Sequence, residues 1–402
     1  MKNILSERIK TVPESFIRRI LKVSNQPDVI SFAGGLPNAD LFPIQDLENA
    51  CVKVLQNNGK QALQYTSTEG DSALREWIAA RYQKAQGLNI SPDNILITNG
   101  SQQALDLLGK VLLNTGDPIA IENPGYLGAI QAFSLYRPKM HTINIDENGM
   151  NTDELEKTLI THKPKLIYTV PNFQNPTGIS YSQENREEVA KIVAQSDSLL
   201  VQDDPYGELR FSGEQKSNFI SLLPEQTILL GSFSKIITPS FRLGWIVAPS
   251  SLMKSLIIAK QAADLHTNYF AQQVIVQYLQ DNAIDEHIDK ISKFYGKQKQ
   301  AMMEAIKKYF PSDVRIDKSE GGMFLWATLP ERISAMELFD KAILNKATFS
   351  EATLEKVAFV PGKPFYVGEN MPENTLRLSY VTMDEDKIRK GIKILGDCIK
   401  NM

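Results

Sequence analysis

The stretch that decides the fold reads Gly231-Ser232-Phe233-Ser234-Lys235, and it is followed by Arg242-Leu243-Gly244-Trp245. Apolar runs lie on both sides, at 227–230 and 245–247, and this layout predicts a strand, a tight loop that carries the lysine, and a second strand. Burial or nearby cations lower the pKa of a lysine, so the amine of Lys235 is placed where it can form an imine with a carbonyl compound. Ser232 and Arg242 can hold an anion beside that amine.

An imine-forming lysine and fixed donors for an anion are together what the cofactor pyridoxal phosphate requires. The pattern Ser-x-Ser-Lys-x(6)-Arg-x-Gly-Trp also resembles the lysine region of the fold type I pyridoxal-phosphate aminotransferases of class I/II. The resemblance implies that Lys235 carries the cofactor and that Ser232, Ser234 and Arg242 contact it. A lone lysine between serines is usually a solvated loop residue, so this interpretation depends on the other parts of the family's site following in order.

Length and composition are those of a globular protein with room for two domains. The 402 residues are 42% apolar and 23% charged, and the net charge of −3 gives no reason to expect nucleic acid or an anionic membrane as a partner. Two distant cysteines and four histidines lead us to expect neither a metal nor a redox site. Without a signal-peptide pattern or a run of about 20 apolar residues, we expect a cytoplasmic protein.

The N-terminal loop carries a second resemblance. Residues Ala33 to Pro43 follow the pattern Ala-Gly-Gly-Leu-Pro-x(4)-Phe-Pro, which is similar to a loop of the α-aminoadipate and kynurenine aminotransferase subgroup. There the glycine that matches Gly35 lies against the substrate carboxylate. Arg18 matches an arginine that in some relatives faces the substrate's distal carboxylate, although a surface helix charge is the other interpretation. The tyrosine that matches Tyr65 bonds the partner's cofactor phosphate, which implies a homodimer with shared active sites.

Between residues 95 and 247, apolar runs alternate with amphipathic segments. Strands are predicted near residues 95, 119, 165, 198, 227 and 245. This order indicates an α/β fold, with a mostly parallel sheet covered by helices on both faces. A long polar helix over about 284–310 is expected to lead to a smaller α+β domain, with strands near 321–326 and 375–380.

The expected organisation therefore has three parts. Residues 1–47 form an N-terminal arm that belongs partly to the small domain, residues 48–283 form the large cofactor-binding domain, and residues 284–402 form the rest of the small domain.

Polar side chains follow several predicted strands, at the edge where open α/β sheets bind ligands. Ser101 and Gln102 lie in a strand-to-helix turn, whose free N–H groups suit a phosphate, and they match the family's phosphate-contacting pair. Tyr126 matches the aromatic ring that stacks on the pyridine ring. The side chain of Asn175 can donate to a phenolate oxygen, and the resemblance places it at the cofactor's 3′-oxygen and beside the substrate carboxylate.

Two further residues follow the strand near 198. Asp203 matches the aspartate that pairs with the protonated pyridine nitrogen, since an ionised carboxylate favours a nearby cation in a buried site. Tyr206 matches the tyrosine that bonds the 3′-oxygen, and Asp204 is interpreted as structural. Arg377 matches the arginine that forks onto the substrate α-carboxylate through two parallel N–H bonds, although without its neighbours it would read as a strand-face charge.

The resemblance covers residues 15 to 379 and implies an aminotransferase whose catalytic residues are Lys235, Asp203 and Tyr206. An L-amino acid of the aminoadipate, aromatic or branched/aliphatic type would pass its amino group to a 2-oxo acid such as 2-oxoglutarate, with ping-pong kinetics.

Two alternatives stay open. One is another reaction on the same cofactor, as in a lyase or a decarboxylase, because the same lysine, aspartate and arginine serve those reactions. The other is the aminotransferase-like domain of a DNA-binding regulator. We expect it less, because about thirty residues precede Ala33, too few for a helix-turn-helix domain, and there is no basic surplus.

Overall fold

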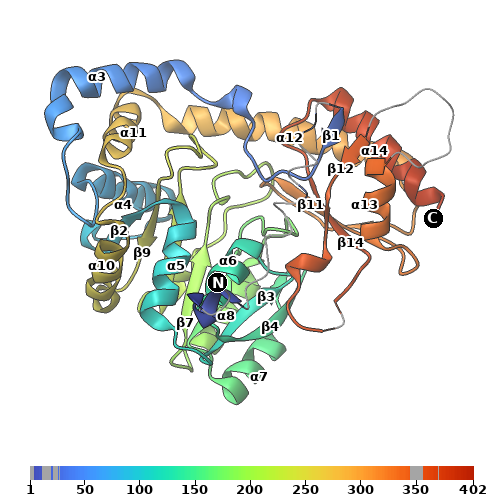
Figure 1. Cartoon of the computed structure of the whole chain (residues 1–402), viewed down its shortest axis with the longest axis horizontal. Coiled ribbons are helices and arrows are strands. Elements are labelled where there is room, and N and C mark those ends of the chain that lie inside the picture. Colours follow the sequence, from blue (N-terminus) through green and yellow to red (C-terminus); the bar gives the residue numbers. More distant parts are fainter. Residues whose placement is uncertain (1–3, 11–19, 21–25, 27, 345–355, 370) are drawn as a thin grey trace.

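The apolar runs of the first two thirds of the chain form one large sheet. The structure is a computed structural model, and it describes residues 4–10, 20, 26, 28–344, 356–369 and 371–402 (Figure 1). The strands, in their order across the sheet, are β2 (Ile95–Thr98), β9 (Gly244–Val247), β8 (Thr227–Ser232), β7 (Leu199–Asp203), β6 (Leu166–Thr169), β3 (Pro118–Asn123), β4 (Lys139–Asp146) and β5 (Gly149–Met150). β9 is antiparallel to β2 and β8, β5 is antiparallel to β4, and the other pairs are parallel.

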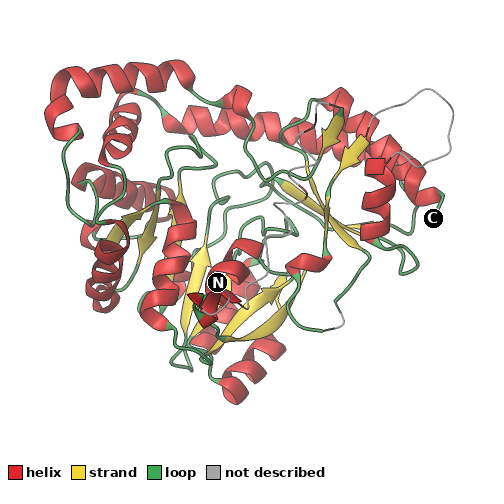
Figure 2. Cartoon of the chain, in the orientation of Figure 1, coloured by secondary structure: helices red, strands yellow, loops and turns green. Residues whose placement is uncertain are grey.

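Helices cover both faces of this sheet (Figure 2). The helices of this part of the chain are α4 (Ser72–Gln86), α5 (Gly100–Leu112), α6 (Leu127–Ser134), α7 (Thr152–His162), α8 (Gln183–Val193), α9 (Phe219–Leu222), α10 (Ser250–Asp264) and α11 (Tyr269–Asp281). A further helix, α3 (Ile44–Ala62), packs on α11. Successive side chains of a strand point to opposite faces. In β3, accordingly, Ile119 and Ile121 belong to one apolar core and Ala120 to a second core on the other face. Burial on both faces explains why these strands read as unbroken apolar runs.

A smaller antiparallel sheet lies at the other end of the molecule (Figure 1). Its strands are, in order, β10 (Arg315–Ile316), β11 (Phe324–Thr328), β14 (Thr375–Ser379) and β13 (Val360–Pro361), and its region includes α13 (Ala335–Leu344) and α14 (Glu385–Lys400). Nearby, β1 (Val29–Ser31) pairs in parallel with β12 (Lys356–Ala358). The short remaining elements are α1 (Glu7–Lys10), η2 (Ala39–Leu41), η3 (Pro92–Asn94) and η4 (Lys363–Phe365).

The long helix α12 (Ile284–Tyr309) runs along one side of the molecule and links the two sheets (Figure 1). Its exposed face is polar, and in the described ranges no helix combines the length and the apolar character that a membrane crossing needs.

The six predicted strands, the long helix and the two strands of the smaller sheet are confirmed within a few residues. β4 and β5 were not predicted. β4 lies near the edge of the sheet, and polar residues separate its apolar residues Met140, Ile143 and Ile145, so it lacks the continuous apolar run of a central strand. The domain boundaries at residues 47 and 283 stay a prediction.

Candidate active site

Lys235 lies three residues beyond the end of β8, in a loop that its own hydrogen bonds hold. The backbone N–H of Ser234 donates to Ser232 Oγ (3.1 Å), and the N–H of Phe233 donates to the carbonyl of Leu243 (3.1 Å). The amine of Lys235 donates to the carbonyl of Gly35 (2.9 Å). Burial lowers the pKa of Lys235 to about 8, and the charges of Arg242 and Arg377 contribute to this lowering. Near physiological pH the amine is therefore neutral, and nucleophilic, in a much larger fraction of molecules than the amine of an ordinary lysine.

Arg377 reaches the same loop from the smaller sheet. Its guanidinium donates to Asn175 Oδ1 (2.8 Å) and to the carbonyl of Ala33 (2.7 Å). The side chain is 2% exposed and lies over the ring of Phe324, with 4.3 Å between the guanidinium carbon and the ring centre. Burial lowers its pKa to about 10. Ala33 and Gly35 are two residues apart, so this loop brings the lysine amine and the arginine guanidinium together.

Asp203 ends β7 and is 1% exposed. The hydroxyl of Tyr168 donates to its Oδ2 (2.8 Å), whereas its Oδ1 is buried and has no hydrogen-bond partner within the described residues. Burial raises the pKa of Asp203 to about 7, and the nearby carboxylates of Asp204 and Glu122 add to this effect. The carboxyl group therefore needs a cationic donor in order to stay ionised.

Three of the predicted residues surround the space between these groups. The side-chain amide of Asn175 approaches the hydroxyl of Tyr206 at 3.5 Å, and both side chains are buried. Tyr126 precedes α6 and is half-buried. Burial and the charge of Asp203 raise its pKa to about 12, while the charges of Arg377 and Arg242 oppose that rise. This ring is thus within electrostatic reach of all three charged side chains.

Ser101 and Gln102 lie in the first turn of α5. Asn99 is the residue before the start of α5, and its side chain makes no cap to this helix. The first backbone N–H groups of α5 are therefore left for a ligand. Gly100 has a φ of +70°, and a Cβ there would come within 2.4 Å of the guanidinium of Arg242. Arg242 also donates to the carbonyl of Asn99 (3.4 Å). A helix N-terminus and an arginine therefore meet at one point, which suits a phosphate.

The structure places Tyr65 at the surface, and it does not describe Arg18. Tyr65 is 76% exposed, and its ring lies edge-on to His266 with 5.7 Å between the ring centres. Arg18 lies outside the described residues.

Pyridoxal phosphate fits the groups that are present. The partnerless Asp203 Oδ1 lacks the donor that a protonated ring nitrogen offers. Asn175 and Tyr206 lie together and can bond one phenolic oxygen. The uncapped start of α5 and Arg242 can hold a phosphate dianion, and the amine of Lys235 has the lowered pKa that attack on an aldehyde needs.

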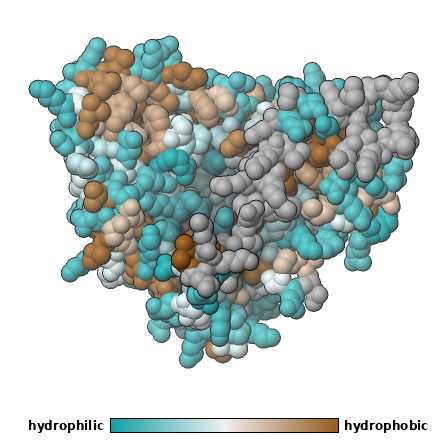
Figure 3. Space-filling view, in the orientation of Figure 1, coloured by the Kyte–Doolittle hydropathy of each residue, from teal (hydrophilic) through white to brown (hydrophobic). Residues whose placement is uncertain are grey.

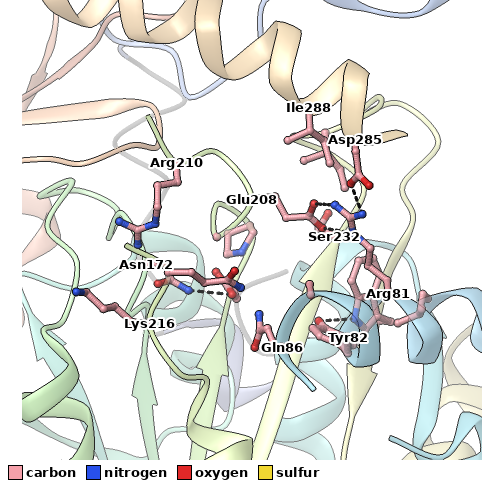
Figure 4. A pocket seen from close by; sticks show the side chains of 18 of the residues that line it. Arg81, Tyr82, Gln86, Asn172, Glu208, Arg210, Lys216, Ser232, Asp285 and Ile288 are labelled. Carbon is pink, nitrogen blue, oxygen red and sulfur yellow. Dashed lines mark hydrogen bonds and ion pairs between the residues drawn. The ribbon is translucent and has the colours of Figure 1, made fainter. Parts of the chain in front are cut away.

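A cavity of about 360 Å³ lies next to this cluster, between α4, the loop 204–216 and the start of α12 (Figure 4), and Ser232 at the end of β8 is among the residues that line it. Arg81 bridges it by ion pairs to Glu208 and Asp285. Asp204 lines this cavity and accepts a hydrogen bond from Asn172 (2.9 Å). The adjacent residues Asp203 and Asp204 thus bond different partners, Tyr168 and Asn172. This difference agrees with the interpretation of Asp204 as structural.

Three aromatic residues that shape the cluster were not predicted. Tyr168 holds Asp203, and the rings of Phe324 and Phe365 lie 4.3 and 5.3 Å from the guanidinium carbon of Arg377. Tyr168 is a tyrosine in an otherwise aliphatic strand, and its hydroxyl in a buried position could have indicated a polar partner nearby. The two phenylalanines read as ordinary core residues.

Comparison with known proteins places the chain in a family. The family described as aminotransferase class I and II matches residues 27–395. The chain is 42% identical to aromatic-amino-acid aminotransferase 1 of Thermococcus litoralis, over 98% of this chain and 94% of that protein.

Solved structures agree with this match. The kynurenine aminotransferase of Pyrococcus horikoshii in complex with PMP has a TM-score of 0.93 and 40% identity, and the match covers 100% of this chain and 98% of that one. The α-aminoadipate aminotransferase of Thermus thermophilus, complexed with N-(5′-phosphopyridoxyl)-L-leucine, has a TM-score of 0.89 and 37% identity, with coverage of 100% and 98%.

The fold and these comparisons define a fold type I enzyme whose cofactor is pyridoxal phosphate. The chain belongs to the class I and II aminotransferases, and it transfers amino groups with that cofactor.

The lowered pKa of Lys235 predicts unusual reactivity in the cofactor-free protein. Its modification by trinitrobenzenesulfonate, followed by peptide mapping, should reach half its maximal rate near pH 8, well below the value of about 10.4 for an ordinary lysine. In the unfolded chain the amine of Lys235 stays protonated up to the ordinary lysine pKa. The free energy of unfolding should therefore increase as the pH rises from about 8 to about 10.4. A midpoint near 10 would contradict the burial of this amine beside the two arginines.

Proposed function

We propose that this enzyme moves the amino group of an aminoadipate, aromatic or branched/aliphatic L-amino acid to a 2-oxo acid such as 2-oxoglutarate. One observation carries the proposal: the loop from Ala33 to Gly35 accepts hydrogen bonds from both Arg377 and Lys235. A substrate carboxylate bound at the arginine therefore leaves the amino group and Cα of the substrate near the lysine. The similar aromatic-amino-acid, kynurenine and α-aminoadipate aminotransferases support this range of donors.

The proposed carboxylate site consists of Arg377, Asn175 and the backbone of Gly35. The guanidinium offers paired N–H groups to a planar carboxylate, and its stacking over Phe324 fixes its plane. Its Nε is buried without a hydrogen-bond partner among the described residues. A substrate carboxylate can accept a hydrogen bond from this Nε. The buried guanidinium of Arg377 therefore has a donor available for an anionic ligand.

When bound, pyridoxal phosphate supplies an aldehyde carbon and a ring that takes up the electron pair released at the substrate Cα. The amine of Lys235, once free, takes the proton from Cα as a general base. A pKa of about 8 suits that role, because a base works best when its pKa lies near the working pH. The carboxylate of Asp203 would keep the ring nitrogen protonated, and Tyr206 and Asn175 would orient the ring through its oxygen.

The order of events follows from one site that serves both substrates. The donor amino acid leaves as a 2-oxo acid before the acceptor enters, so the kinetics are ping-pong. Arg377 binds the carboxylate of each in turn. Retention of a bound amino group between the two half-reactions distinguishes this enzyme from a lyase or a decarboxylase.

We also propose a cytoplasmic homodimer in which each chain completes the other's site. Tyr65 is exposed, and its ring contacts His266 of its own chain. Exposed apolar side chains occur along and beside α3, and Figure 3 shows apolar surface in this region at the upper left. They are Ile44, Val52, Leu55 and Leu63. A second copy that covers this face can bring its Tyr65 to the phosphate site.

A panel of amino donors with 2-oxoglutarate or pyruvate tests the reaction. We expect amino transfer from at least one donor of the proposed classes, strictly dependent on the 2-oxo acid. Ammonia or carbon dioxide released without an acceptor, and no transfer, would favour a lyase or a decarboxylase instead.

Replacement of Asp203 separates cofactor binding from turnover. Asp203→Asn should keep the cofactor bound but lower kcat by about a hundredfold or more, because the amide cannot hold the proton on the ring nitrogen. Asp204→Asn is the matched control, because that carboxylate lines the cavity of about 360 Å³. This substitution should lower the unfolding temperature more than it lowers kcat. Equal kcat in Asp203→Asn and the unmodified enzyme would mean that another carboxylate faces the ring.

Mixed dimers test the shared site. Lys235→Ala and Tyr65→Ala should each be nearly inactive alone. In a mixed dimer, one site holds both substitutions and the other holds neither, so random re-association should restore about a quarter of the unmodified rate. No recovery, with mixed dimers shown to form, would place Tyr65 outside the partner's site.

A further inference from the structure

An ion pair between a buried lysine and a partly buried aspartate lies beside the proposed phosphate site. Lys260, on α10, has no exposed surface, and its amine lies 2.7 Å from Asp264 Oδ1, one helical turn further on. The amine also donates to Gln103 Oε1 (2.8 Å) and Thr267 Oγ1 (2.9 Å). Thr267 in turn donates to the carbonyl of Ile97 in β2 (3.3 Å). Through Gln103 and Thr267, the buried amine of Lys260 therefore links α10 to α5 and to β2 of the large sheet.

Asp264 holds the turn that begins α5. Its Oδ2 accepts hydrogen bonds from the side-chain amides of Asn99 and Gln103 (2.7 Å for Gln103). Gln103 Oε1 accepts from the backbone N–H of Asn99 (2.8 Å). Both ends of the turn from Asn99 to Gln103 are thus fixed to one carboxylate that lies outside the turn.

This arrangement changes what Asn99 does. An asparagine at the N-cap position usually accepts a hydrogen bond from the second or third N–H group of the helix. Here the side chain is bonded to Asp264 and makes no cap. The N–H groups of Ser101 and Gln102 are left for a ligand, and the carbonyl of Asn99 accepts from Arg242 (3.4 Å), the other group proposed to bind phosphate.

A carboxylate next to a phosphate site carries an electrostatic cost. The side chain of Asp264 is 24% exposed, so solvent screens its charge only in part, and that negative charge would repel a phosphate dianion bound next to it. The amine of Lys260 contacts both oxygens of Asp264 and cancels the charge without occupying the uncapped N–H groups.

We propose that Lys260 and Asp264 are positioning residues for the cofactor phosphate. Asp264 keeps the Asn99 side chain off the helix N-terminus, and Lys260 neutralises Asp264, so that a dianion can bind there. This inference rests on the proposed placement of the phosphate between α5 and Arg242.

Comparison of pyridoxal phosphate with pyridoxal, which lacks the phosphate, tests the inference. Dissociation constants are measured on the full-length chain by equilibrium dialysis and absorbance. Lys260→Met should weaken pyridoxal phosphate by about tenfold, because it leaves Asp264 unpaired, but should change pyridoxal by less than about twofold. Lys260→Met with Asp264→Asn should bind pyridoxal phosphate more tightly than Lys260→Met alone. Lys254→Met, which removes an exposed charge from the same helix, is the control and should change neither ligand.

A purely structural role gives a different pattern. It would weaken both ligands equally in Lys260→Met, or leave the double variant as weak as the single one, and either result overturns the inference. If Lys260→Met does not fold, Lys260→Gln carries the same expectations, because it also removes the charge but keeps a donor for Thr267. Arg242→Met separates the two proposals: if it does not weaken pyridoxal phosphate relative to pyridoxal, the phosphate placement itself is wrong.

Discussion

The site depends on one short loop that accepts hydrogen bonds from two cationic side chains. The carbonyls of Ala33 and Gly35 bond Arg377 and Lys235, across sequence separations of 344 and 200 residues. Both cations are drawn out of water there, and burial is the largest cause of the lowered pKa of each. The N-terminal loop, the large sheet and the small sheet must therefore all be in place before the amine faces the guanidinium.

The charges of the site are unbalanced until ligands bind. Arg242 and Arg377 add to the effect of burial in lowering the pKa of Lys235, and both oppose the rise in the pKa of Tyr126, whereas burial raises the pKa of Asp203 to about 7. A phosphate dianion, a substrate carboxylate and a protonated ring nitrogen together supply the opposite charges. Asp203 Oδ1 and Arg377 Nε are buried and have no hydrogen-bond partner in the part of the chain that the structure describes. Buried unsatisfied polar groups lower stability, and they are typical of binding sites.

The sequence predicted the large sheet well, because strands buried on both faces read as continuous apolar runs. It could not show that β9 enters the sheet antiparallel to its neighbours, since an apolar run carries no direction. The residues that follow the strands could be predicted to meet, because parallel strands end at one edge. Neither the contact between Lys235 and Gly35 nor the Lys260–Asp264 pair could be predicted, because both join distant or chemically ordinary positions. The assigned roles of the site residues stay predictions, and Arg18 lies outside the described residues.

Covalent labelling tests the central claim most directly, namely that the amine of Lys235 bonds to pyridoxal phosphate. The full-length protein is incubated with the cofactor, reduced with borohydride, digested, and mapped by mass spectrometry. The account predicts one phosphopyridoxyl group per chain, on Lys235, with none on the buried Lys260. A protein that stays colourless and unlabelled, or that carries the label on another lysine, would contradict it.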